Sequence, residues 1–131
     1  MSEPRVLLAD DHAFLLRAVA GLLSQSCKVV GAVSDGATLV SEALRLNPDV
    51  IVTDITMPGL SGIDAIQQIA GSGCLARFVF LTVHTEQEFV ETCLAHGALG
   101  YVHKSRMKAH LVAAIREALG GRSYISLPKP G

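Results

Sequence analysis

The chain has 131 residues and half of them are hydrophobic, which suffices for one compact domain with a single core. Its formal net charge is only -1 and 18 % of its residues are charged. This balance argues against a polyanion-binding surface as the main feature of the segment, so we expect no direct binding of nucleic acid.

The cysteines and the N-terminus indicate the cellular compartment. Cys27, Cys74 and Cys93 are odd in number and show no CxxC spacing, which disfavours a disulfide framework and a zinc knuckle. The N-terminal residues lack the layout of a signal peptide, and no apolar run approaches the roughly 20 residues that span a bilayer. We therefore expect free thiols in a cytoplasmic protein that does not enter the membrane.

Short apolar runs alternate with longer stretches of helical period along the chain. The runs predict five strands, at residues 5–9, 29–33, 50–53, 78–82 and 100–103, each brief enough to be buried on both faces of a parallel sheet. The longer stretches predict five amphipathic helices, at residues 13–23, 39–46, 63–70, 86–96 and 108–119. Gly71, Gly97 and Gly120 stand where the last three helices are expected to end in a residue that tolerates a positive φ.

This order of elements, strand then helix five times over, predicts an α/β fold. We expect the flavodoxin-like arrangement, a five-stranded parallel sheet in the order 2-1-3-4-5 inside a three-layer sandwich. Residues 1–122 form the expected domain, and residues 123–131, which contain two prolines, are predicted to be the start of a linker or a frayed tail.

Polar residues follow the carboxyl ends of the predicted strands, where sheets of this kind place their functional crevice. Asp10 and Asp11 follow the first strand, Asp54 the third and Lys104 the fifth, and Thr82 ends the fourth. The first and third strands are neighbours in the expected order, so the three aspartates come together. Carboxylates so placed repel one another unless a cation neutralises them, and oxygen ligands suit Mg²⁺ or Mn²⁺.

Some of the polar residues also fit structural roles. Asp10 and Asp11 are typical of a helix N-cap with a solvated neighbour, and capping is compatible with metal binding. The histidines show no ligand spacing on one helix, so surface or capping roles are expected of His12, His84, His96, His103 and His110. Of these, His84 is expected at the rim of the crevice because it lies two residues after Thr82.

Four motifs in order resemble the receiver domains of two-component response regulators. They are Ala9-Asp10-Asp11-His12, the segment from Val52 to Gly62, Leu81-Thr82-Val83-His84, and the segment from Gly100 to Ser105. The resemblance spans about residues 5 to 120. Val83 stands where many receivers have a smaller residue, and Ser105 where many have proline, which removes the expectation of a cis peptide after Lys104.

The resemblance implies a phosphoprotein of phosphorelay signal transduction, in which Asp54 accepts the phosphoryl group from a sensor histidine kinase. The metal ligands implied for magnesium or manganese are Asp10, Asp11, Asp54 and the backbone carbonyl of Thr56. Thr82 is expected to hydrogen-bond the phosphoryl group, Lys104 to pair with it, and Tyr101 to act as a rotameric switch. A half-buried tyrosine with a hydrated hydroxyl is the alternative for Tyr101.

The segments around His12, Thr82 and residues 120–126 look like the LuxR/NarL branch, whose members usually continue into a helix-turn-helix DNA-binding domain. We therefore expect the front part of a transcription regulator, a signalling domain that assists its own phosphorylation and dephosphorylation and is not an enzyme. A homodimer is left open. The alternatives are a natural stand-alone receiver and an aspartate-nucleophile phosphatase. Phosphatases of that kind share a DxD motif, and here Thr56 stands in the place of its second aspartate.

Overall fold

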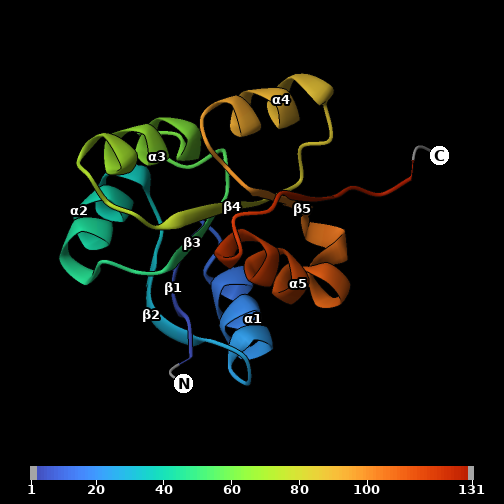
Figure 1. The fold of residues 1–131 in the computed structure, drawn as a ribbon, viewed down its shortest axis with the longest axis horizontal. Coiled ribbons are helices and arrows are strands. Elements are labelled where there is room, and N and C mark those ends of the chain that lie inside the picture. The colour runs from blue at the N-terminus through green and yellow to red at the C-terminus, as the bar shows by residue number, and fades with distance from the viewer. Residues whose placement is uncertain (1–2, 130–131) are drawn as a thin grey trace.

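A computed structural model describes residues 3–129 as alternating parallel strands and helices (Figure 1). The strands are β1 (Arg5–Ala9), β2 (Lys28–Val33), β3 (Val50–Thr53), β4 (Arg77–Thr82), β5 (Gly100–His103) and β6 (Tyr124–Ser126). The helices are α1 (Ala13–Leu23), α2 (Gly36–Leu46), α3 (Gly62–Gly71), α4 (Gln87–Ala95) and α5 (Met107–Leu119), with a 3₁₀ turn, η1 (Lys104–Arg106), before α5. All predicted helices and strands are confirmed.

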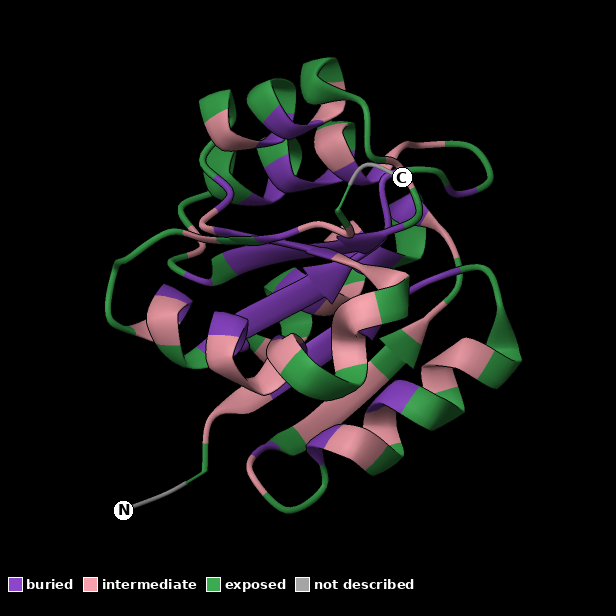
Figure 2. Ribbon diagram, turned by 90° about the vertical axis from the view of Figure 1, so that its right-hand side faces the viewer, coloured by how far each residue is buried: buried purple, intermediate pink, exposed green. Residues whose placement is uncertain are grey.

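The sheet has the order β2-β1-β3-β4-β5-β6, and all its pairs are parallel. Helices α2, α3 and α4 pack on one face and α1 and α5 on the other, so two apolar clusters flank the sheet. Figure 2 shows the central strands as the most buried layer, with the exposed residues gathered on the outer sides of the helices. The predicted three-layer sandwich and strand order are therefore confirmed.

Strand β2 departs from the prediction that every strand is buried on both faces. It pairs only with β1, at the edge of the sheet, and its residues are exposed or half-buried along its whole length. By contrast, β3 lies between two other strands and is buried throughout. The apolar composition of β2 did not distinguish an edge position from a central one.

Helix ends are fixed by side-chain caps at two N-termini and by glycine at C-termini. The Asp35 carboxylate accepts the Thr38 N–H at 2.8 Å, and Ser61 caps α3 in the same way. Gly97 has the predicted positive φ of 98°, but Gly120 does not, and Gly71 is still helical. After α3 and α5 the chain continues in a turn before it reverses, so the positive φ falls at glycines 73 and 121.

The sixth strand was not predicted, because Tyr124–Ser126 lies in the stretch expected to be a linker or a frayed tail. It pairs with β5, and Ser126 is buried. The Arg106 Nε–H donates to the Ser126 hydroxyl at 2.8 Å, and His110 Nδ1 lies 2.6 Å from the same oxygen. Met1, Ser2, Pro130 and Gly131 lie outside the described residues, and so does the end of the predicted tail.

The cysteine side chains lie wholly or partly inside the domain. Cys27 and Cys93 are buried, Cys74 is half-buried, and all three thiols are free. Burial raises the pKa of the Cys93 thiol to about 12, which keeps this thiol protonated. Within residues 3–129, no helix is both long and apolar enough to cross a membrane.

The contacts of Ser126 lead to a prediction about stability. Replacing Ser126 with alanine removes the partner of two part-buried polar groups, Arg106 Nε and His110 Nδ1. We expect the free energy of unfolding to fall by about 1–2 kcal/mol, measured by urea denaturation followed by circular dichroism. Ser123→Ala, at an exposed serine in the same segment, is the matched control. Equal stability of the two variants would show that β6 is not anchored through Ser126.

Candidate functional site

Two buried carboxylates lie side by side at the carboxyl ends of the central strands. The Asp10 N–H donates to the Val33 carbonyl at 3.0 Å, and the Asp54 N–H donates to the Ala9 carbonyl at 3.0 Å. Each aspartate thus extends its parallel ladder by one bond, which fixes the backbone from which its side chain projects. Asp10 is 4 % and Asp54 5 % exposed. The sequence prediction that these residues meet is confirmed.

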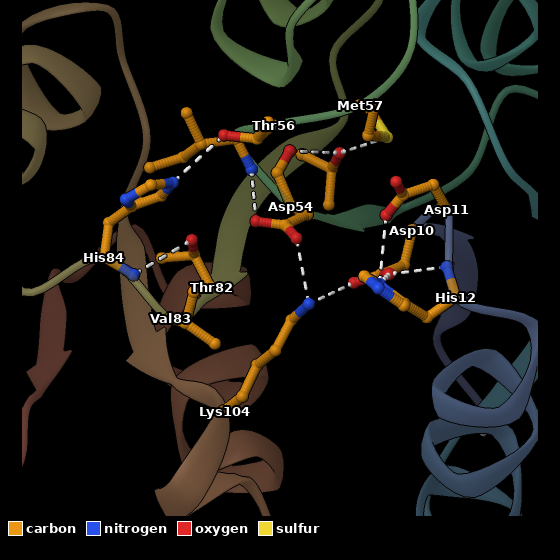
Figure 3. Close-up of polar contacts among 12 residues, drawn as sticks. Asp10, Asp11, His12, Asp54, Thr56, Met57, Thr82, Val83, His84 and Lys104 are labelled. Atoms are coloured by element: carbon orange, nitrogen blue, oxygen red, sulfur yellow. Dashed lines mark hydrogen bonds and ion pairs between the residues drawn. The ribbon is translucent and has the colours of Figure 1, made fainter.

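Lys104 supplies the positive charge between them. Its ammonium lies 2.8 Å from Asp10 Oδ2 and 2.9 Å from Asp54 Oδ2, and Figure 3 shows it pointing between the two carboxylates. Burial lowers the pKa of Lys104, but the hydrogen bonds and charges of Asp10 and Asp54 outweigh burial, so its pKa is raised above the usual value. The lysine therefore remains charged. These three side chains form a charge triad, with both carboxylates buried and the lysine half-buried.

Asp11 and His12 extend the acidic group toward the surface. His12 Nδ1 lies 3.0 Å from both Asp10 Oδ1 and Asp11 Oδ1, and the His12 N–H donates to Asp10 Oδ1 at 2.9 Å. Ligand atoms of these three side chains lie within 4.8 Å of one another, so they could hold a cation together. His12 was not predicted as a member of this group, because the spacing of histidines within single helices gives no sign of it.

The capping role considered for Asp10 and Asp11 does not hold. The N-cap residue of α1 is His12, and its side chain makes no capping hydrogen bond. The Asp10 carboxylate turns instead toward Lys104 and His12. The Asp10 carboxylate is therefore directed into the crevice, while Asp11 lies nearer the surface against His12.

The loop after β3 folds tightly against Asp54. The Asp54 Oδ1 atom accepts the Ile55 N–H at 2.7 Å, and the Ile55 carbonyl accepts the Gly62 N–H at 2.7 Å. A Cβ atom added at Gly62 would lie 1.9 Å from the Asp54 carbonyl oxygen, so only glycine allows this approach. The carboxylate of Asp54 is thus held at one oxygen by the backbone and at the other by Lys104. The same loop carries Thr56.

His84 joins three parts of the site rim. Its Nε2 atom lies 3.0 Å from the Thr56 hydroxyl, and its ring stacks on Phe89 with the centroids 4.3 Å apart. The backbone N–H of His84 donates to the hydroxyl of the fully buried Thr82 at 3.3 Å (Figure 3). The expected rim position of His84 is confirmed, and the contact with Thr56 could not be foreseen from sequence.

Tyr101 is fully buried, and its hydroxyl donates to the His84 carbonyl at 2.7 Å. Burial, which disfavours the charged phenolate, raises the pKa of this hydroxyl. The alternative of a half-buried ring with a hydrated hydroxyl is therefore wrong.

The peptide bond between Lys104 and Ser105 is trans, as the absence of proline implied, and residues 3–129 contain no cis peptide bond.

Comparison with known proteins identifies the family that this chain resembles. The response regulator receiver domain family matches residues 6–116. Response regulator UvrY of Escherichia coli (strain K12) is 35 % identical over 123 residues, which cover 92 % of this chain and 56 % of UvrY. Transcriptional regulatory protein MctR of Rhizobium johnstonii is 35 % identical over 124 residues, which cover 93 % of this chain and 58 % of MctR.

Solved structures agree with these relatives. The crystal structure of a two-component response regulator of the LuxR family from Aurantimonas sp. SI85-9A1 has a TM-score of 0.88 and 32 % identity. The match covers 96 % of this chain and 90 % of that one. The chain spans little more than half the length of UvrY and MctR. It belongs to the response regulator receiver domain family, and its similarities place it in the LuxR/NarL branch.

Proposed function

We propose that Asp54 accepts a phosphoryl group from a phosphohistidine of a sensor kinase, with a divalent cation bound beside it. The observation that carries this proposal is the charge triad, in which Lys104 lies within 2.9 Å of both Asp10 and Asp54. A buried carboxylate held at both oxygens is a positioned nucleophile, and the neighbouring ammonium can pair with the negative charge of a phosphoryl group.

The residues of the site fit the magnesium that receiver domains generally bind in an acidic pocket. Asp10, Asp11 and Asp54 present more negative charge than Lys104 neutralises, and carboxylate and carbonyl oxygens are the ligands that Mg²⁺ and Mn²⁺ prefer. These three aspartates, with the backbone carbonyl of Thr56, are the proposed ligand set. A cation bound there supplies the positive charge that lets anionic donor and anionic acceptor approach each other.

The transfer itself is a substitution at phosphorus. A bond forms between an Asp54 carboxylate oxygen and phosphorus, the bond from phosphorus to the donor imidazole nitrogen breaks, and the imidazole takes up a proton. Lys104 pairs with the incoming phosphoryl oxygens, and the Thr82 hydroxyl donates a hydrogen bond to one of them. Positioning and charge neutralisation are the main requirements of such a reaction. Water reverses the modification by attack at the same phosphorus, which breaks its bond to the Asp54 oxygen and releases inorganic phosphate and the free carboxylate.

The output of the domain is proposed to be transcriptional. UvrY is named a response regulator and MctR a transcriptional regulatory protein, and each extends well beyond the part that this chain matches. We propose that a helix-turn-helix DNA-binding domain is the partner on which this receiver acts, through a homodimer or directly. A stand-alone receiver remains the alternative.

The first prediction of this proposal concerns the acceptor. Incubation with acetyl phosphate and Mg²⁺ should give a single phosphoryl adduct by intact mass spectrometry, and chelation of the metal should abolish it. Asp54→Asn should remove the adduct because this carboxylate contacts Lys104 and the backbone of its own loop together. Asp64→Asn, at an exposed aspartate of α3, should form the adduct normally. An adduct of full yield in Asp54→Asn would refute the assignment.

A second prediction concerns the metal. Asp11→Asn removes one charge from the proposed ligand set, while the ion pairs of Lys104 are with Asp10 and Asp54 and stay in place. We expect the affinity for Mg²⁺ to fall by at least about tenfold in a calorimetric titration, since even outer partners of metal ligands contribute ~10–100-fold. The control is again Asp64→Asn. Unchanged affinity of Asp11→Asn would exclude Asp11 from the ligand set.

A third prediction concerns transmission through Thr82. We propose that the phosphoryl group draws Thr82 toward Asp54 and that the Tyr101 ring responds, which repacks α4, β5 and α5. Thr82→Ala should still accept phosphate but lose most of the phosphorylation-dependent NMR shift changes across residues 84–118. Thr85→Ala, at an exposed threonine nearby, should keep them. If Thr82→Ala retained the full changes, the signal would travel by another route.

A further inference from the structure

His103 is the last residue of β5, and it pairs with Thr82, the last residue of β4. Beyond this rung the two backbones separate, because β5 passes directly into the 3₁₀ turn η1. Both residues that are proposed to contact the phosphoryl group therefore lie where regular pairing stops. Thr82 is at the rung itself, and Lys104 is the first residue of η1.

The hydrogen bonds of the His103 ring fix its tautomer. The Ser105 N–H donates to His103 Nδ1 at 3.1 Å, and the Ser105 hydroxyl lies 2.7 Å from the same nitrogen. A backbone N–H is always a donor, so Nδ1 must accept and the ring hydrogen must be on Nε2. His103 Nε2 lies 3.1 Å from the Val83 carbonyl oxygen, to which it then donates. Each ring nitrogen has a partner of the correct kind.

The His103 ring thus links β4 and β5 just beyond the last residues at which the two strands pair. On one side it caps η1 at Ser105, the neighbour of Lys104, and on the other it holds Val83, the neighbour of Thr82. Val83 is 59 % exposed, so packing alone does not restrain this carbonyl. The Thr82 hydroxyl itself accepts a hydrogen bond from the backbone N–H of His84. This bond is 3.3 Å long, which is long for a hydrogen bond.

We propose that His103 is a positioning residue for phosphoryl transfer, whose Nε2–H bond to the Val83 carbonyl fixes the Thr82 hydroxyl relative to the Lys104 ammonium by tying the end of β4 to the end of β5. This inference rests on the proposed function of Asp54. His103 does not touch the phosphoryl group. Its effect passes through Thr82, because a displacement of the β4 end changes the distance that the Thr82 hydroxyl must bridge, and transfer is sensitive to such displacements.

Two substitutions separate the two bonds of the ring. His103→Asn places an amide oxygen near the position of Nδ1, so it keeps the cap on η1 but cannot reach Val83. His103→Gln places an amide nitrogen near the position of Nε2, so it keeps the donor to Val83. With acetyl phosphate and saturating Mg²⁺, we expect His103→Asn to lower the maximal rate of adduct formation by about tenfold and His103→Gln to restore it to within about twofold of the unmodified chain.

The Thr82→Ala background tests whether the effect passes through Thr82. In that background His103→Asn should change the rate by less than about twofold, since the hydroxyl to be positioned is absent. Equal rates for His103→Asn and the unmodified chain, equal slowing by both His103 variants, or a full tenfold effect in the Thr82→Ala background would each overturn the inference while the proposed function stands. Failure of the unmodified chain to form any adduct would overturn the proposed function, and this inference with it.

Discussion

The ion contacts of Lys104 with Asp10 and Asp54 are the constraint on which the arrangement of this domain depends. Two carboxylates that are about 95 % buried repel each other strongly unless a cation lies between them, and an unpaired buried charge is expensive. Lys104 can reach both only because β1 and β3 are adjacent and the chain turns sharply after β5. The contacts of Lys104 with both aspartates thus depend on three features, namely the strand order, the loop after Asp54 that requires glycine, and the 3₁₀ turn.

That arrangement is not neutral, and its imbalance accounts for the proposed chemistry. One ammonium faces two buried carboxylates, and Asp11 adds a third carboxylate closer to the solvent. A divalent cation is attracted to this excess, whereas a phosphate alone is repelled by it. The proposed requirement for a metal therefore follows from the charges of the described residues. Lys104 already has two partners, so it can exchange one of them for a phosphoryl oxygen without losing all its charge compensation.

The sequence predicts the repeated elements of the fold and misses its individual long-range contacts. Five strands and five helices follow from period and composition, and the aspartate cluster follows from the rule that parallel strands end at one edge. Strand β6 has only three residues, and it pairs with β5 and contacts Arg106 and His110, which local composition does not reveal. The contacts of His12, His84 and His103 were also missed, since their partners are set by the tertiary structure.

These long-range contacts share a consequence for the loop after β4. His84 ties this loop to the loop after β3 through Thr56, and His103 ties it to η1 through the Val83 carbonyl. Thr82 directly precedes the two tied residues, Val83 and His84, and the Tyr101 hydroxyl is bonded to the carbonyl of His84. A displacement of Thr82 toward Asp54 would therefore strain both contacts of the following residues together, since close-packed interiors transmit small shifts and do not absorb them. A charge change confined to Asp54 would in this way reach the buried ring of Tyr101 through its hydrogen bond to the His84 carbonyl.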